Sequence, residues 1–150
     1  MKALIKASIA ACAIFLISST SGFAATAQQQ SCGLLNSLSS GDLRAQLNGF
    51  LKLTSHWTQS SKNNLQNNAR SALQNAKIIG GELYLIGDFG QNMQDHMLII
   101  RNAPGGVAYV RLVYEWAPNE PRLEHITFED HIAVILRQAI PQAPKKLNCG

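Results

Sequence analysis

Apolar residues first recur at helical spacing between Ser37 and Leu51. Four of them lie at i, i+4, i+7 and i+8, on one face of a helix: Leu43, Leu47, Phe50 and Leu51. Ser40 or Asp42 is available as the N-cap residue. This pattern predicts a first amphipathic helix.

A second apolar stripe runs through a stretch that is rich in Asn, Gln and Ser. Its members lie at i, i+4, i+7, i+8 and i+11: Leu65, Ala69, Ala72, Leu73 and Ala76. Such a composition is also common in linkers, but the spacing predicts a second helix with a narrow face that packs on a sheet. We expect Trp57 to anchor the start of this helix and Ile78–Gly81 to end it.

After Gly81 the apolar period falls to two residues. Four segments rich in β-branched and aromatic residues follow, separated by short turns with Gly, Asn or Pro: Glu82–Phe89, Asp95–Arg101, Val107–Trp116 and Arg122–Asp130. These segments predict a four-stranded antiparallel meander. The third segment is the longest, so we expect it in the centre of the sheet.

The last apolar stripe is compatible with two structures. Its residues have helical spacing: Ile132, Ile135, Leu136, Ala139 and Ile140. A helix here would have Asp130 as N-cap and end at Pro141, whereas the β-branched residues favour a fifth strand over His131–Leu136. The expected fold class is α+β, with two N-terminal helices packed on a curved antiparallel sheet of about four strands and a short C-terminal helix or fifth strand.

The first residues have the three parts of a secretory signal peptide. Lys2 and Lys6 precede an apolar run, Ala7–Ile17, and small polar residues follow it. The run is too short for a membrane-spanning helix, which needs about 20 apolar residues. We expect cleavage after Ala27 or after Ala24.

Removal of this leader would leave one domain, residues 28–150, in the periplasm or outside the cell. Lipoprotein processing at Cys12 is disfavoured because the apolar run continues beyond that cysteine. Cys32 and Cys149 then remain at the two ends of the domain. In an oxidising compartment they are expected to form a disulfide, the alternatives being free thiols or an intermolecular bridge.

Charge and motifs narrow the possible partners. The chain has 13 Lys and Arg, nine Asp and Glu and a formal charge of +4, which loss of the two leader lysines lowers to +2. The longest basic run is Lys145-Lys146, so the sequence does not favour nucleic acid as a partner. It contains no Gly-rich phosphate loop and no His-Glu-x-x-His motif, so we expect no cofactor and no metal.

The stretch from "ELYLIGDF" to "RLEHITFED" contains residues that match a known family: Tyr109, Arg111, Tyr114, Pro118-Asn119, Leu123 and Phe128-Glu129-Asp130. Through them, residues 55–130 resemble small exported members of the nuclear-transport-factor-two-like superfamily. The resemblance implies a cone in which a curved sheet wraps around a long helix and leaves a pocket. The superfamily includes hydrolases, isomerases and non-catalytic binding modules, so the resemblance implies a cavity but no particular chemistry.

His125 is the most plausible general base, because histidine titrates near neutral pH. In an extended segment it shares a face with Leu123, Thr127 and Glu129, but Glu129 is about 13 Å away along the strand, too far for a shared metal ion. Asp88, Glu115 or Tyr114 on neighbouring strands would have to orient it. His56 and His96 have no better claim.

Several strand residues are candidates for ligand binding: Tyr109, Arg111, Tyr114, Trp116 and His125. Arg111 binds an acidic ligand or projects from a solvated face, and we favour the second. We expect a non-catalytic domain that binds a small molecule or an envelope protein through a cone pocket or sheet face. The alternatives are a small hydrolase or isomerase based on His125, and a homodimer formed through the aromatic strand.

Overall fold

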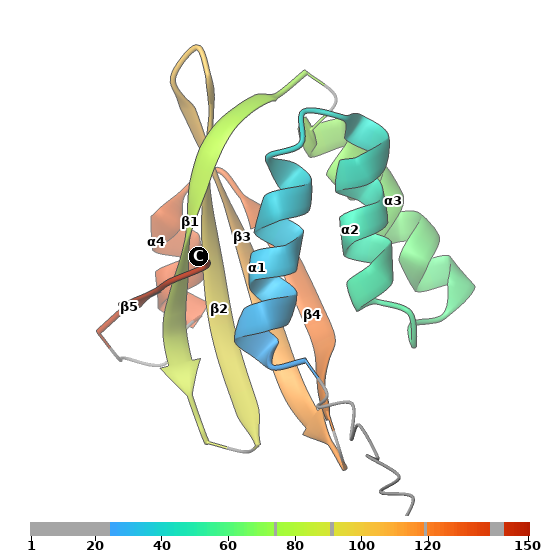
Figure 1. Cartoon of the computed structure of the whole chain (residues 1–150), viewed down its shortest axis with the longest axis vertical. Helices are drawn as coiled ribbons and strands as arrows, with labels where there is room; N and C mark the ends of the chain where they lie inside the picture. The colour runs from blue at the N-terminus through green and yellow to red at the C-terminus, as the bar shows by residue number, and fades with distance from the viewer. Residues whose placement is uncertain (1–24, 74, 91, 119, 139–142) are drawn as a thin grey trace, which may run out of the picture.

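The computed structural model describes residues 25–73, 75–90, 92–118, 120–138 and 143–150. Three helices precede a four-stranded meander, which a fourth helix and a short fifth strand follow (Figure 1). The helices are α1 (Ala27–Leu38), α2 (Leu43–Leu53), α3 (Gln59–Leu73) and α4 (Ile132–Gln138). The strands are β1 (Lys77–Asp88), β2 (Met93–Ala103), β3 (Gly106–Ala117), β4 (Glu120–Glu129) and β5 (Lys145–Leu147). The predicted α+β class is confirmed.

Helix α1 was not predicted from the sequence. Thr26 starts it with a capping box: its hydroxyl accepts a hydrogen bond from the backbone N–H of Gln29, and the Gln29 side chain accepts one from the backbone N–H of Thr26. The first predicted helix, Ser37–Leu51, therefore combines the end of α1 with α2. Asp42 is the N-cap of α2, as one of the two alternatives proposed.

The predicted boundary between the second helix and the first strand was wrong by several residues. Helix α3 ends at Leu73 and β1 begins at Lys77, so Ile78–Gly81 belongs to the strand. Ile78 is buried in the core, and Gly81 lies where α1 crosses β1, with space too small for a side chain. Gly81 thus accommodates close helix–strand packing, and the glycine pair does not end a helix.

The sheet is antiparallel, in the order β4-β3-β2-β1-β5. Strand β2 is in the centre, and β1 equals β3 in length, so the prediction that the third strand is longest and central was wrong. Strand β5 pairs with Leu83–Leu85 at the edge of β1, between two bulges at Ile79 and Ile86. Strand β4 is the opposite edge.

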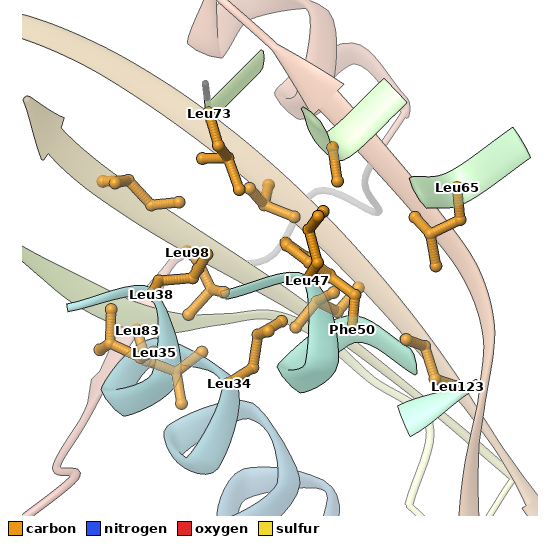
Figure 2. Packing of buried hydrophobic residues seen from close by; sticks show 14 of the residues in the cluster. Leu34, Leu35, Leu38, Leu47, Phe50, Leu65, Leu73, Leu83, Leu98 and Leu123 are labelled. Carbon is orange, nitrogen blue, oxygen red and sulfur yellow. The ribbon is translucent and has the colours of Figure 1, made fainter. Parts of the chain in front are cut away.

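The two faces of the sheet pack on different helices. The inner face packs on α1, α2 and α3 through a leucine-rich core to which all three helices and the sheet contribute (Figure 2). The outer face is partly covered by α4, whose Ile135 is buried against Ile86 and Met97. No helix of the described residues is long and apolar enough to span a membrane.

The C-terminal region contains both predicted elements. Helix α4 confirms the helical alternative, and the fifth strand lies at Lys145–Leu147, not at His131–Leu136. His131, and not Asp130, precedes the first helical residue, so the predicted Asp130 N-cap was wrong. Ala139, Ile140 and Pro141 lie outside the described residues.

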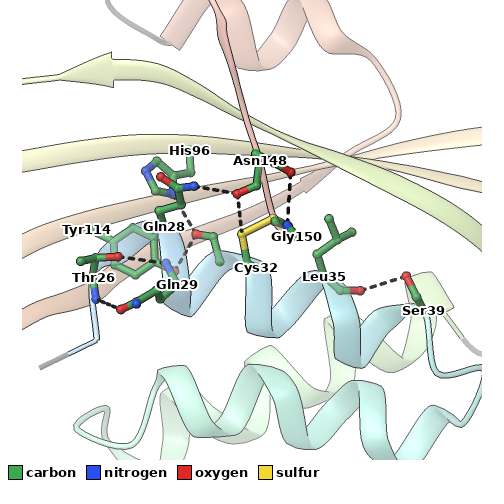
Figure 3. Close-up of a disulfide and its surroundings, with 12 residues drawn as sticks. Thr26, Gln28, Gln29, Cys32, Leu35, Ser39, His96, Tyr114, Asn148 and Gly150 are labelled. Atoms are coloured by element: carbon green, nitrogen blue, oxygen red, sulfur yellow. Dashed lines mark hydrogen bonds between the residues drawn. A yellow bond between two sulfur atoms is a disulfide. The ribbon is translucent and has the colours of Figure 1, made fainter. Parts of the chain in front are cut away.

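The predicted disulfide between Cys32 and Cys149 is present, with the two Cα atoms 5.3 Å apart (Figure 3). It joins α1 to the segment after β5. The Gln28 side chain adds a hydrogen bond of 2.8 Å to the backbone oxygen of Asn148. The C-terminal segment is therefore held against α1 by a covalent bond and a hydrogen bond.

Candidate functional site

A concave site lies between α3 and the edge strand β4. We call it the α3–β4 groove; it has a volume of about 610 Å³. Leu65, Ile126 and Phe128 contribute apolar surface to it, and Trp57 lies at one end. The groove is therefore amphipathic, with an apolar floor and polar walls.

The helical wall carries a row of uncharged polar side chains. Ser61, Asn64, Asn68 and Ser71 lie at i, i+3, i+7 and i+10 on the face of α3 that lines the groove. The side chains of Asn64, Asn68 and Ser71 make no hydrogen bond within the described part of the chain, whereas the Ser61 hydroxyl lies 2.9 Å from the Thr58 hydroxyl. These side chains offer both donors and acceptors to a molecule in the groove.

Two contacts connect the segment before α3 to β4 near one end of the groove. The indole Nε1 of Trp57 donates a 2.7 Å hydrogen bond to the backbone oxygen of Leu123, and His56 Nε2 lies 3.3 Å from a carboxylate oxygen of Glu124. Trp57 therefore anchors the start of α3, as predicted. Because Ala72 near the other end of α3 lies by Phe128, the helix runs in the same direction as β4.

The strand wall is formed by His125–Phe128, and a β-bulge precedes it. Val113 pairs with His125 but Tyr114 pairs with Leu123, so Glu124 is an extra residue in β4. The bulge places Leu123, Ile126 and Phe128 against the same inner core. The predicted face shared by Leu123 and His125 was therefore wrong, because the alternation was assumed to be unbroken.

His125 lies at the groove without a carboxylate partner among the residues proposed for it. Its Nε2 atom is 2.8 Å from the Thr127 hydroxyl, and its side chain is exposed. Asp88 lies on β1, three strands away, where it accepts hydrogen bonds from Gly90 and Gln94. Glu115 is an exposed residue of β3 paired with Arg122 in the register. The structure does not bring His125, Asp88 and Glu115 together.

The other predicted ligand-binding residues do not line the groove. Arg111 makes a bidentate ion pair with Asp95, with its closest nitrogen 2.6 Å from the carboxylate, and only 13% of its side chain is exposed. The favoured solvated position of Arg111 was therefore wrong. Tyr109 packs on the outer face, whereas Tyr114 and Trp116 pack in the inner core, so the three aromatic residues do not form one surface.

A second, more apolar hollow adjoins the groove and shares Ala72 and Phe128 with it. We call it the apolar hollow; its volume is about 430 Å³. Leu73, Val107 and Val110 contribute to its wall. Acidic residues at the end of β4, Glu129 and Asp130, also line it, and no Lys or Arg among the described residues lines either site.

A buried polar cluster, which was not predicted from the sequence, joins α1 to the inner face of the sheet (Figure 3). The Ser31 hydroxyl lies 2.8 Å from His96 Nδ1 and donates a 3.0 Å hydrogen bond to the Tyr114 hydroxyl. All three side chains are fully buried, and His96 Nε2 has no hydrogen-bond partner in the described structure. Burial lowers the pKa of His96 to about 4 and raises that of Tyr114 above its usual range.

This cluster resembles a nucleophile–base pair only in composition. Because none of its three side chains is exposed, a substrate cannot reach Ser31 without separation of α1 from the sheet. Its role here is to hold α1 in position. Among the described residues no group of three or more His, Cys, Asp or Glu is arranged to hold a metal ion.

Comparisons with protein-family models, with curated proteins and with solved structures found no match. The row of polar side chains on α3 and the groove that it lines were not predicted from the sequence. Their signal was present as the spacing of Ser61, Asn64, Asn68 and Ser71, which lie beside the apolar stripe of the same helix.

Proposed function

We propose that this protein is an exported, non-catalytic binding domain that holds its ligand in the α3–β4 groove. The observation that carries the proposal is the row of polar side chains on α3 that line the groove, of which Asn64, Asn68 and Ser71 make no side-chain hydrogen bond within the described part of the chain. Serine and asparagine are poorer helix formers than Ala, Leu or Gln. Their repeated use on this face is therefore accounted for better by recognition than by helix stability.

The composition of the groove also favours binding over catalysis. Ligand sites commonly combine apolar surface with a few polar groups that fix the orientation of the ligand. Here Leu65, Ile126 and Phe128 supply the apolar surface and the amides of Asn64 and Asn68 supply the polar groups. His125 adds a polar ring at the rim, where its neighbour is the Thr127 hydroxyl.

Two further features support the proposal. The Cys32–Cys149 disulfide suits an oxidising compartment outside the cytoplasm, in agreement with the leader-like residues at the N-terminus. The layered arrangement of helices on a sheet is compatible with a place in the nuclear-transport-factor-two-like superfamily, which we retain as part of the proposal.

The proposal is tested by a matched pair of variants, Asn68→Ala and Asn67→Ala. Both replace an exposed asparagine of α3, but only Asn68 lines the groove. We expect a library of small amides, saccharides and short peptides to shift amide NMR signals of α3 and β4 in the wild-type protein. Asn68→Ala should weaken the best binder by about fivefold or more, in line with the loss of a hydrogen bond, and Asn67→Ala should leave it unchanged.

Signals that shift mainly on the outer face of the sheet would contradict this proposal. The same holds for a binder whose affinity is insensitive to Asn68→Ala. Circular dichroism of both variants would show whether α3 is retained, so that a loss of binding can be separated from a loss of helix.

A further inference from the structure

Strand β4 has an unprotected edge only where it faces the groove. Its first half carries features that prevent edge pairing: Pro121, the charged Arg122 and the bulge at Glu124. The next four residues, "HITF" at His125–Phe128, have no proline, no bulge and no Lys, Arg, Asp or Glu. Among the described residues, no turn, loop or cap forms a backbone hydrogen bond with these four residues.

The two walls have comparable lengths. From His125 to Phe128 an extended strand spans about 10 Å, and the eleven residues from Ser61 to Ser71 span about 15 Å of helix. Both walls line the same groove and run in the same direction. An extended segment of four or five residues therefore fits along the whole groove.

The chemistry of the walls suits a polypeptide backbone. Alternate residues of an edge strand direct N–H and C=O groups away from the sheet, where an added strand pairs with them. The amides of Asn64 and Asn68 supply donors and acceptors on the other side. Because no Lys or Arg lines the groove, a phosphate or carboxylate ligand has no counter-charge there.

We propose that the α3–β4 groove binds an extended peptide segment of another protein, which adds to the sheet as a strand next to β4. This inference rests on the proposed function and specifies the class of ligand. Backbone pairing with His125–Phe128 supplies affinity independent of side chains, as in other cases of strand addition. The side-chain amides of Asn64 and Asn68 on α3 form hydrogen bonds with the opposite edge of the added strand.

The apolar hollow specifies the side chains of this segment. It adjoins the groove at Phe128, so a residue at that end of the bound segment places an apolar side chain among Leu73, Val107 and Val110. Glu129 and Asp130 lie beside it and favour a neighbouring Lys or Arg. The preferred segment is therefore uncharged over most of its length and ends in an apolar residue next to a basic one.

One buried hydrogen-bond acceptor in the apolar hollow has no donor among the described residues, which favours a ligand that donates hydrogen bonds. Oδ1 of Asn102 is buried and has no partner in the described structure, and Asn102 lines the apolar hollow. Buried acceptors without a partner are uncommon in native structures. A backbone N–H or a basic side chain of the bound segment would satisfy this acceptor.

The test starts from a seven-residue peptide library selected on the disulfide-bonded protein. The selected peptide is synthesised with its natural backbone and as two N-methylated forms, methylated on alternate amides. N-methylation removes the donor, so the set whose amides face β4 should lose at least tenfold in affinity and the other set should lose much less. Hydrogen exchange should slow at His125–Phe128 on binding.

Matched variants distinguish this inference from the function on which it rests. Asn68→Ala should weaken the peptide by at least fivefold, Asn67→Ala should not, and Glu129→Gln should reduce the preference for a basic residue. A saccharide or small amide that binds in the groove, while the library yields no peptide sensitive to Asn68→Ala, would overturn the inference and leave the proposed function intact.

Three other outcomes also overturn it. Equal tolerance of both methylation patterns would show that no strand is added. Slower exchange on the outer face, with β4 unchanged, would place the peptide elsewhere and would contradict the proposed function too. Concentration-dependent self-association that protects His125–Phe128 and is blocked by the peptide would identify a second copy of this chain as the occupant.

Discussion

His96 is a neutral imidazole in a site that disfavours its charged form. Ser31 from α1 and Tyr114 from β3 face it, Asp88 is the one carboxylate that favours its charge, and burial lowers its pKa to about 4. In the unfolded chain histidine has a pKa of about 6.5, so the unfolded state binds the proton first as the pH falls. The stability contributed by neutral His96 is complete above pH 6.5 and is lost toward pH 4.

We predict that the free energy of unfolding falls by up to about 3 kcal/mol between pH 7 and pH 4 through this group. Urea denaturation at several pH values measures the fall. His96→Asn should be less stable at pH 7 but should show a flatter pH profile. His125→Asn is the matched control, because His125 is exposed, and it should keep the wild-type slope. An unchanged slope in His96→Asn would remove His96 as the cause.

Gly81 is required by the close approach of α1 to β1. A Cβ atom at this position would lie 2.6 Å from Leu35 Cδ1 and 2.9 Å from the backbone oxygen of Ile99. Since the backbone atom cannot move freely, Gly81→Ala should destabilise the protein by about 1–3 kcal/mol. Thermal denaturation measures this loss.

Gly33 in α1 provides the opposite control. No atom lies within 4 Å of a Cβ placed there, so Gly33→Ala should stabilise the helix by about 1 kcal/mol. Equal effects of the two substitutions would show that α1 does not pack on β1 as described. Because both substitutions add the same methyl group, the opposite effects on stability would reflect the space available at Gly81 and at Gly33.

At the residue scale, the sequence was least informative where the backbone departs from regular geometry. The bulge at Glu124 changes which residues of β4 face the core, and no local signal distinguishes it from a regular strand. Arg111 was expected in solvent, but its partner Asp95 is 16 residues away, and their contact depends on the register of β2 and β3. Register of this kind depends on tertiary packing.

Among the helices, α1 has the strongest start signal. The capping box provides hydrogen-bond acceptors for the backbone N–H groups of Thr26 and Gln29. Ala27, at the first helical position, is buried. Cleavage of the predicted leader after Ala27 would remove Thr26 and Ala27. Loss of the cap would lower the stability of the protein by about 1 kcal/mol. Cleavage after Ala24 would keep them.

We therefore predict that the mature protein begins at Ala25. Mass spectrometry of the exported protein determines its first residue. Thr26→Ala should leave that residue unchanged but lower the melting temperature, because the cap is lost. A mature chain that begins at Gln28 would contradict the prediction and would imply that α1 is stable without its cap.

The disulfide and β5 act together as one element. The bond connects residues separated by 117 positions, and β5 has only three residues, so the short strand gains most of its stability from this tether. We predict that Cys32→Ala with Cys149→Ala lowers the free energy of unfolding by about 2–5 kcal/mol. Hydrogen exchange at Lys145–Leu147 should become faster before any other strand is affected.

Lys146→Gln separates the tether from the surface ion pair. Lys146 Nζ lies 2.8 Å from Glu82 Oε1, and both groups are solvent-accessible, so loss of this pair should change stability little. If Lys146→Gln accelerated exchange of β5 as much as loss of the disulfide, the ion pair and not the tether would hold the strand.

At the element scale, prediction succeeded where a long apolar pattern was present. The four strands of the meander and the helices α2, α3 and α4 follow such patterns, although with shifted ends. Helix α1 was missed because its polar "AQQQSC" start follows directly on the predicted leader, so the apolar stripe through Leu34, Leu35 and Leu38 was not separated from it. Strand β5 is too short to have a pattern.

At the scale of the whole molecule, the sequence was sufficient for the class of fold and the disulfide, but not for the site. A groove between α3 and β4 depends on how far the helix lies from the sheet edge, and no single segment encodes that distance. The candidate residues chosen on one strand were distributed over two faces by the pleat, so only His125 was placed at the groove.

The two edges of the sheet differ in a way that sets the stoichiometry of any assembly. On the β1 side, β5 occupies Leu83–Leu85 and bulges flank it, whereas on the β4 side no strand of the described part of the chain pairs with His125–Phe128. A molecule in which only one sheet edge can pair binds a single added strand. It then has no second edge with which another molecule could pair. Assembly then stops at one-to-one complexes, and a filament could grow only after the C-terminal strand had been released.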